Sequence, residues 1–210
     1  VEEIAHDISL NYGFSQINTP TFEDTSLFIR GIGKGTDLVD KEMYTFQDKG
    51  GNSQTLRSEG TAPVMRAYLQ HGMHTLNQPV KLYYIAPVFR YDRPQAGRYR
   101  EHRQFGVEAI GETDPALDAE VITLAHDYYK KLGISKISLQ LNSIGCNTCR
   151  PLYLKKLVGF YQKHRSNLGQ DCRNRLDINP LRLFDCKEKN CRNSGNEIVS
   201  AVKSASLNGV

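Results

Sequence analysis

The chain has 210 residues, of which 39% are hydrophobic and 24% are charged, and its formal net charge is +4. This composition is ordinary for a globular protein and excludes a disordered chain. No apolar run approaches the length of a bilayer span, so a membrane protein is excluded as well. The start, Val1-Glu2-Glu3-Ile4, lacks the basic residues and the apolar core of a signal peptide. It also lacks an initiating Met, which suggests a fragment or a processed chain.

Short elements separated by turn residues are predicted in the first part of the chain. Apolar residues at helical spacing or in alternation, and the positions of Gly and Pro, define them. In chain order they are a helix from residue 1 to about Gly13, an extended run at 14–19 closed by Pro20, a loop at 31–36, a hairpin of strands 44–46 and 54–57, and a helix from Thr61 to about His71.

Longer elements follow. They are strands at 80–90 and 98–111 around a Pro/Gly loop at 92–97, a helix opened by Asp114-Pro115 and ended by Gly133, a strand at 134–141, and a helical stretch at 152–168. Hairpin-linked strands with helices between them indicate the α+β class, with an antiparallel β-sheet flanked by helices. A parallel dinucleotide-binding sheet would need a Gly-rich turn after its first strand, and the sequence has none.

The charge is divided unevenly along the chain. Residues 142–210 carry 12 Lys and Arg against 5 Asp and Glu, whereas residues 1–141 are mildly acidic. We therefore place a domain boundary between residues 141 and 142. The basic part suggests contact with a polyanion, although a solvated basic face is an equal alternative.

One face of the strand at 98–110 carries an unusual set of polar groups. At period two this face holds Arg98, Arg100, His102, Gln104, Gly106 and Glu108, and the opposite face holds Arg103, Phe105, Val107 and Ala109. An apolar face that packs on helices would leave the arginines, the amide and the carboxylate on a rigid surface. This pattern favours a binding site over a solvated sheet, which more often carries mixed Lys, Glu and Thr.

Three arginines surround the neighbouring hairpin turn: Arg90, Arg93 and Arg98. A guanidinium group can bind two phosphate oxygens at once through two N–H donors, and it stays charged at neutral pH. The turn would therefore suit a triphosphate. The alternative is an exposed basic loop that binds nothing.

Residues 89–100 and 104–108 together resemble motif 2 of the class II aminoacyl-tRNA synthetases in its histidyl form. Residues 56–61 resemble the Glu-Gly-Thr loop of the histidyl-tRNA synthetase family, and residues 14–21, around Pro20, resemble motif 1. Segments 142–145 and 179–186 are also similar to family segments, so the resemblance covers nearly the whole chain. It implies a class II catalytic core at 1–141, followed by the start of a helical insertion domain.

The resemblance also implies roles for individual residues. Arg90 would hold the α-phosphate of ATP and the histidine carboxylate, and Arg93 and Arg98 would hold the outer phosphates. The histidine-binding residues would be Glu59, Gly60, Thr61, Gln104 and Glu108. Ser58 stands where the family has Pro and Arg103 where many relatives have His, but neither departure removes a proposed ligand.

The implied activity is that of a histidine–tRNA ligase in the cytoplasm. Histidine would be adenylated by ATP with Mg²⁺ and passed to tRNA(His), and motif 1 implies a homodimer. We find no motif 3 and no anticodon-binding domain in the chain, so we expect little activity from it alone. The basic part would approach the tRNA through residues such as Lys155, Lys156, Arg165, Arg173 and Arg175.

Two other functions compete with the ligase. One is the histidine-binding regulatory subunit of ATP phosphoribosyltransferase, which shares the fold. Three features favour the ligase: the intact Glu-Gly-Thr loop, the Arg93-Pro94-Gln95 triplet and the basic second part of the chain. The other is a non-catalytic RNA-binding module, which leaves the polar face of the strand at 98–110 unexplained.

The five cysteines include two closely spaced pairs, Cys146 with Cys149 and Cys186 with Cys191. Four thiolates at such spacing could close a tetrahedral structural Zn²⁺ site, and Cys172 would then be left over or could replace one ligand. The alternative is a set of unligated thiols, which is ordinary in the cytosol.

Overall fold

The computed structural model describes residues 1–33, 36, 38–93, 95–142 and 145–186. The chain divides into two compact units, Val1–Leu139 and Gln140–Val210. The boundary expected between residues 141 and 142 lies two residues beyond this division.

A three-stranded sheet forms the centre of the first unit. Its order is β1 (Ser15–Gln16), β5 (Val80–Phe89) and β6 (Glu101–Ile110). The antiparallel β5–β6 pair is in register from Val80 opposite Ile110 to Phe89 opposite Glu101, which confirms the two long predicted strands. Their Val, Tyr, Ile and Phe side chains suit a pleated, half-buried surface. β1 pairs with β5 in parallel, so this sheet is mixed and not purely antiparallel as expected.

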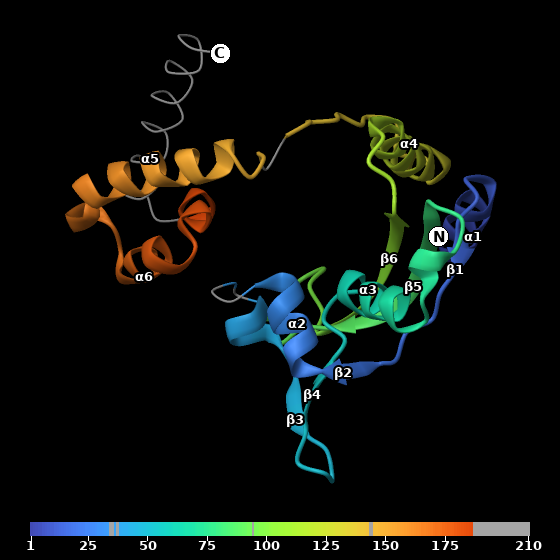
Figure 1. The fold of residues 1–210 in the computed structure, drawn as a ribbon, viewed down its shortest axis with the longest axis horizontal. Coiled ribbons are helices and arrows are strands. Elements are labelled where there is room, and N and C mark those ends of the chain that lie inside the picture. The colour runs from blue at the N-terminus through green and yellow to red at the C-terminus, as the bar shows by residue number, and fades with distance from the viewer. Residues whose placement is uncertain (34–35, 37, 94, 143–144, 187–210) are drawn as a thin grey trace. The chain divides into compact units, whose positions relative to one another are not determined.

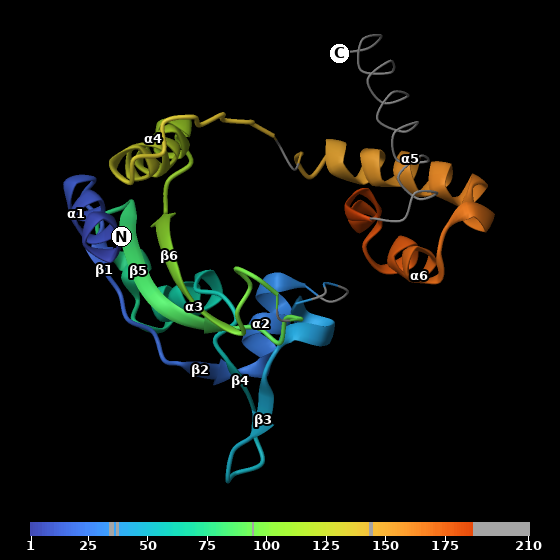
Figure 2. The same ribbon diagram turned by 180° about the vertical axis from the view of Figure 1, so that it is seen from behind.

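Helices cover both faces of the β5–β6 pair (Figures 1 and 2). On one face, α1 (Glu2–Asn11) and α4 (Pro115–Lys131) enclose a core that contains Ile8, Tyr83 and Leu124. On the other face, α3 (Thr61–Gln70) packs Val64 against Tyr84 and its β5 neighbours. Asp114 accepts a hydrogen bond from the Ala116 amide at 2.8 Å, which confirms the predicted start of α4.

A second sheet, of order β2-β4-β3, lies beside α2 (Thr25–Ile32). The hairpin of β3 (Thr45–Gln47) and β4 (Ser53–Leu56) is confirmed, and Figure 1 shows it projecting from the rest of the unit. β2 (Phe22–Asp24) and α2 were not predicted. Short turns complete the unit: a π-type turn at Leu38–Glu42 and a 3₁₀ turn at Met73–Thr75.

The strand predicted at 134–141 is wrong, because these residues adopt no strand. A strand needs a neighbour whose N–H and C=O groups complete its ladder. Within the described part of the chain, the first sheet ends at β6, and Leu139 is 63% exposed. Alternation in the sequence is therefore not sufficient to make this segment a strand.

All of the described regular structure of the second unit is helical. Its elements are α5 (Cys149–Lys163), a turn at Arg165–Asn167, α6 (Gln170–Ile178) and a turn at Pro180–Asp185. α5 ends before the predicted limit of residue 168 because the chain turns at Arg165–Asn167. The core includes Leu157, Tyr161, Cys172 and Leu176. Among the described helices of the chain, none is long and apolar enough to cross a membrane.

Candidate active site

The loop between β4 and α3 places a carboxylate at a helix N-terminus. Glu59 accepts hydrogen bonds from the first amides of α3, with Oε2 2.7 Å from Thr61 N and Oε1 2.9 Å from Ala62 N. These amides have no partner inside the helix, and the helix dipole favours a negative charge there. Glu59 is thus held rigidly, and its oxygens keep lone pairs for another donor.

The predicted alternation is confirmed within β6, since Phe105, Val107 and Ala109 pack against the α1–α4 core. Arg98 and Arg100, which were expected on the same polar face, lie before the strand begins at Glu101. Gln104, Gly106 and Glu108 therefore lie on the α3 face. There the Thr61 hydroxyl donates a hydrogen bond to Glu108 Oε1 at 2.8 Å, although the two residues are 47 positions apart. The structure thus brings two separate predicted histidine-binding segments together.

The amide of Gln104 adds an acceptor on the same face. Its Oε1 atom is buried and has no hydrogen-bond partner among the described residues. A buried oxygen in this state costs free energy unless something donates to it. Oε1 of Gln104 can therefore accept a hydrogen bond from a bound molecule.

The carboxylates of Glu59 and Glu108 both lie beside Thr61. Burial raises the pKa of Glu108, the hydrogen bond from Thr61 opposes that rise, and the negative charge of Glu59 adds to it. The pKa of Tyr84, on the paired strand, is raised to about 12, first by burial and then by Glu108. An excess of negative charge and acceptors favours a cationic guest, such as an ammonium group.

We expect Glu108→Gln to raise the melting temperature at neutral pH. Because the folded state holds the Glu108 proton more tightly than the unfolded state does, Glu108 costs stability as pH rises from its ordinary pKa of 4.5 through the raised folded-state value. The gain in melting temperature caused by Gln should be largest at pH values above both pKa values of Glu108 and should vanish below both. Thermal melts of both proteins between pH 4 and pH 8 measure the effect. An equal gain at every pH would contradict it.

A cleft of about 430 Å³ opens beside Glu59 and Thr61, between α2 and α3. Leu27 and Met65 supply apolar wall, and Arg66 lies at its side. A pocket of this size, with a few convergent polar groups, suits a small molecule.

Arg90 lies next to the same loop. Its Nε donates to the carbonyl oxygen of Ser58 at 2.9 Å, and its backbone N–H donates to Arg100 O at 2.8 Å. This contact places a cation beside the residues that precede α3. The bond to Ser58 occupies one donor of the guanidinium and leaves the others for an anion.

The other two predicted phosphate ligands lie on the outer hairpin. Arg98 Nε is 3.2 Å from Asp92 Oδ2, and the Arg98 side chain is 56% exposed. Arg93 is also exposed. Arg100 lies over the Tyr91 ring, 4.0 Å from its centroid. The structure thus places Arg90 against the loop that carries Glu59 and Thr61, and leaves Arg93 and Arg98 at the surface.

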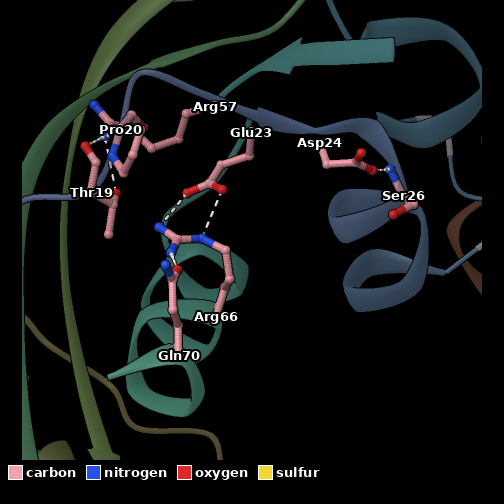
Figure 3. A network of polar contacts seen from close by, with 8 residues as sticks. All are labelled: Thr19, Pro20, Glu23, Asp24, Ser26, Arg57, Arg66 and Gln70. Atoms are coloured by element: carbon pink, nitrogen blue, oxygen red, sulfur yellow. Dashed lines mark hydrogen bonds and ion pairs between the residues drawn. The ribbon is translucent and has the colours of Figure 1, made fainter. Parts of the chain in front are cut away.

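Sequence reasoning missed Arg57, which connects the predicted motif 1 to this site (Figure 3). Its guanidinium, in a residue only 3% exposed, donates from Nη1 to Thr19 O at 2.8 Å and to Pro20 O at 3.1 Å, and from Nε to Pro87 O at 3.0 Å. Burial lowers the pKa of Arg57. Beside it, Glu23 and Arg66 form a separate ion pair at 2.7 Å. An arginine in an otherwise uncharged strand was the only signal in the sequence.

In the second unit, the first cysteine pair is close. Cys146 Sγ and Cys149 Sγ are 3.3 Å apart and both residues are exposed. Hydrogen bonds from the Cys149 backbone and side chain lower the pKa of Cys146 to about 7. Cys186 packs against the core of the unit, and Cys191 lies outside the described residues. No group of three metal-binding side chains occurs within the described ranges.

Comparisons with known proteins agree on one family. Residues 1–149 match the family model described as histidyl-tRNA synthetase. The chain is 58% identical over 192 residues to the histidine–tRNA ligase of Dehalococcoides mccartyi and 56% identical over 195 residues to that of Desulforudis audaxviator. These matches cover 91% and 93% of this chain, but the chain spans only 46% of each relative.

Solved structures agree with this result. The apo histidyl-tRNA synthetase of S. aureus is 44% identical, with a TM-score of 0.52 over 63% of this chain and 34% of that one. A Bacillus halodurans protein, titled ATP phosphoribosyltransferase regulatory subunit/histidyl-tRNA synthetase, is 21% identical, with a TM-score of 0.61 over 96% of this chain and 59% of that one. The latter likeness shows the fold alone. From the match over residues 1–149, the chain belongs to the histidyl-tRNA synthetase family.

Proposed function

We propose that this chain supplies part of the catalytic site of a histidine–tRNA ligase. One observation carries the proposal: Thr61 contacts Glu108 at 2.8 Å, which joins the Glu-Gly-Thr loop to the motif 2 strand. Glu59 on one side and Arg90 on the other then frame a site with negative charge at one end and positive charge at the other. Free histidine has an ammonium and a carboxylate in the same arrangement.

In this proposal the carboxylates of Glu59 and Glu108 and the hydroxyl of Thr61 hold the cationic groups of histidine. Gln104 accepts from the substrate through its unpartnered Oε1. Gly60 carries no side chain, which lets the loop pack against Tyr84, since a Cβ atom there would lie 2.1 Å from Tyr84 Cζ. Charge-assisted hydrogen bonds of this kind are about twice as strong as neutral ones.

Arg90 would neutralise the α-phosphate of ATP while the histidine carboxylate attacks its phosphorus atom and pyrophosphate departs. Such a step depends on positioning and on charge neutralisation more than on a protein base. Arg93 and Arg98, exposed on the hairpin, would hold the outer phosphates. Mg²⁺, when bound with the nucleotide, would neutralise part of the charge of the phosphates.

We further propose tRNA(His) as the acceptor, a homodimer formed through motif 1, and a location in the cytoplasm. The exposed Phe22 and Phe46 rings, 6.0 Å apart on the second sheet, support a protein–protein contact near motif 1. The proposed tRNA phosphate contacts in the second unit are Lys155, Lys156, Arg165, Arg173 and Arg175. Lys155 and Lys156 are exposed on α5, whereas Arg165 is paired with Asp177 at 3.1 Å and Arg173 donates to Leu168 O at 2.9 Å.

The test is histidine-dependent exchange of pyrophosphate into ATP by the product of the complete gene, with the other amino acids as controls. Exchange with histidine alone is expected. Histidine binding without exchange would refute the proposed ligase activity. The regulatory subunit of ATP phosphoribosyltransferase would then be the better explanation.

For the cysteines we propose a structural Zn²⁺ held by Cys146, Cys149, Cys186 and Cys191. The close contact of the first two thiols and the lowered pKa of Cys146 support it. Two thiolates on one tetrahedral zinc lie about 3.8 Å apart, so the observed 3.3 Å pair needs only a small adjustment.

We expect the purified chain to contain about one zinc per molecule and the double variant Cys146→Ser/Cys149→Ser to contain almost none, since two of four ligands are lost. Mass spectrometry of the metal content measures this. Cys172→Ala, at the buried thiol, is the matched control and should keep the metal. A chain that is purified without zinc under reducing conditions and gains none when zinc is added would refute the site.

A further inference from the structure

Two thiols of the second unit face each other at the start of α5. Sγ of Cys146 lies 3.3 Å from Sγ of Cys149, which is the first residue of that helix. To form a disulfide bond the two sulfur atoms must approach to about 2 Å. A small rotation of either side chain supplies this movement, so the backbone can stay where it is.

Backbone hydrogen bonds hold the two sulfur atoms in this arrangement. The N–H of Cys146 donates to Cys149 Sγ at 3.0 Å, and the N–H of Cys149 donates to Cys146 Sγ at 3.3 Å. The N–H of Arg150 donates to Cys146 O at 2.9 Å, which closes the backbone turn between the two cysteines. Each sulfur is therefore fixed by the backbone of the other residue.

Gly145 contributes to the same turn. Its φ is +77°, in the left-handed region that side chains rarely adopt. A Cβ atom at this position would lie 3.0 Å from Cys149 Sγ, which is closer than ordinary van der Waals contact. The glycine therefore allows the chain to turn into α5 with the Cys149 sulfur directly against it.

Access from solvent separates this pair from the other described cysteines. Cys146 and Cys149 are exposed, whereas Cys172 is 2% exposed within the core of the unit and Cys186 is half-buried against that core. A thiol reacts only when a reagent can reach its sulfur atom. An oxidant in solution would therefore meet Cys146 and Cys149 first.

We propose that Cys146 and Cys149 are a redox-active dithiol, which a low-molecular-weight disulfide such as glutathione disulfide converts into an intramolecular disulfide. This modification goes beyond the proposed ligase activity and does not depend on it. In a reducing compartment such a disulfide is transient, because it forms under oxidising conditions and free thiols reverse it.

The reaction consists of two exchange steps. One cysteine sulfur bonds to a sulfur of the external disulfide, whose S–S bond breaks, and the first external thiol leaves with the proton of that cysteine. The other cysteine sulfur then attacks the cysteine sulfur of the mixed disulfide, and the second external thiol leaves with the second proton. The protein loses two electrons and two protons, and the external disulfide gains them. The second step is intramolecular and fast, because the two cysteines are already in contact.

Oxidation of the pair and the proposed zinc site exclude each other. Zinc is bound by thiolates, and a sulfur atom in a disulfide has no negative charge to offer the metal. The disulfide would remove two of the four proposed ligands. The same two residues would therefore hold zinc when reduced and release it when oxidised.

The experiment uses the product of the complete gene, which is reduced, freed of metal with a chelator, exposed to glutathione disulfide and then alkylated. Trypsin should release residues 137–155 as one peptide, because the Arg150–Pro151 bond resists the protease, and the peptide contains no cysteine besides Cys146 and Cys149. We expect mass spectrometry to find this peptide without alkyl groups and two hydrogen atoms lighter than its reduced form. Dithiothreitol should restore both alkylation sites. A peptide with both thiols alkylated after oxidation, or linked to another cysteine, would overturn the proposal.

Cys149→Ser tests the second exchange step. This variant should stop at the mixed disulfide, with one glutathione on Cys146, because the attacking sulfur is absent. If wild type accumulated the same mixed disulfide, the two sulfur atoms would not reach each other and the proposal would be refuted.

Cys172→Ala is the matched control at the buried thiol. It should form the disulfide between Cys146 and Cys149 at a rate within about twofold of wild type. In wild type, Cys172 itself should take up glutathione at least about tenfold more slowly than the exposed pair is oxidised. Equal rates at Cys172 and at the pair would show that unfolding of the unit controls the reaction, which contradicts the proposal.

Zinc ions added before the oxidant test the exclusion between metal and disulfide. Bound zinc should protect Cys146 and Cys149 from glutathione disulfide, and slow oxidation of the loaded protein should release the metal. A disulfide that forms while the zinc stays bound would overturn the exclusion. A protein that binds no zinc would refute the proposed zinc site, and the masses of the peptide at 137–155 would still decide whether the disulfide forms.

Discussion

Replacing Arg57 by Met is expected to lower the free energy of unfolding of the first unit by about 3 kcal/mol. The Met side chain fills most of the space but donates no hydrogen bond. The carbonyl oxygens of Thr19, Pro20 and Pro87 would each lose a donor that is now 2.8–3.1 Å away. Such a loss lowers the melting temperature by roughly 10 °C in a protein of this size.

The network in Figure 3 explains why the effect should be large. The backbone of Arg57 also takes part, since its N–H donates to Thr21 O at 2.8 Å and its carbonyl accepts from Phe89 N at 2.8 Å. Arg57 therefore joins the segment before β2, the end of β5 and the loop that carries Glu59. These segments are far apart in the sequence, so few other contacts could replace it.

Thermal and urea unfolding of the chain would measure the change. Arg57→Lys is the informative control, because it keeps the charge but a single ammonium cannot copy the planar fork of donors. We expect it to lie between wild type and Arg57→Met. An Arg57→Met protein within about 0.5 kcal/mol of wild type, the range of ordinary surface changes, would show that water replaces the guanidinium at little cost.

Replacing Arg90 by Lys is expected to reduce kcat/KM for histidine-dependent exchange by about 10² to 10³, the usual cost of losing a group that neutralises charge in the transition state. Arg90 is held by its Nε bond to Ser58 O at 2.9 Å, which leaves its remaining donors in a fixed direction. Lysine has a point charge on a flexible chain, so it could not bond to Ser58 and grip a phosphate in the same geometry.

Arg103→Ala provides the matched control for Arg90→Lys. Arg103 is on β6, next to the hairpin, but its guanidinium is paired with Glu2 of α1, with Nη2 3.1 Å from Oε2. This pair is about half exposed and contributes little to stability. We expect exchange within about twofold of wild type. If Arg103→Ala lost as much exchange activity as Arg90→Lys, the loss would come from the reduced positive charge near the hairpin. The specific role proposed for Arg90 would then be refuted.

The sequence by itself determined the elements whose signals are local. Alternation in residues 98–110 separated Phe105 and Val107 from Gln104 and Glu108 correctly, because side chains of a strand alternate whatever surrounds it. Asp114 and Pro115 located the start of α4 because capping depends on the nearest few residues. The resemblance to the family rested on residues that stand together in the chain.

Only the tertiary structure decided which segments meet. The segment at 134–141 alternates like a strand but has no neighbour in the described part of the chain to complete its ladder, so the pattern misled. The pairing of β1 with β5 in parallel could not be read from either strand. The role of Arg57 was also hidden, because its partners lie tens of residues away. Local propensity determines what a segment can form, whereas long-range pairing and burial determine which groups share a site.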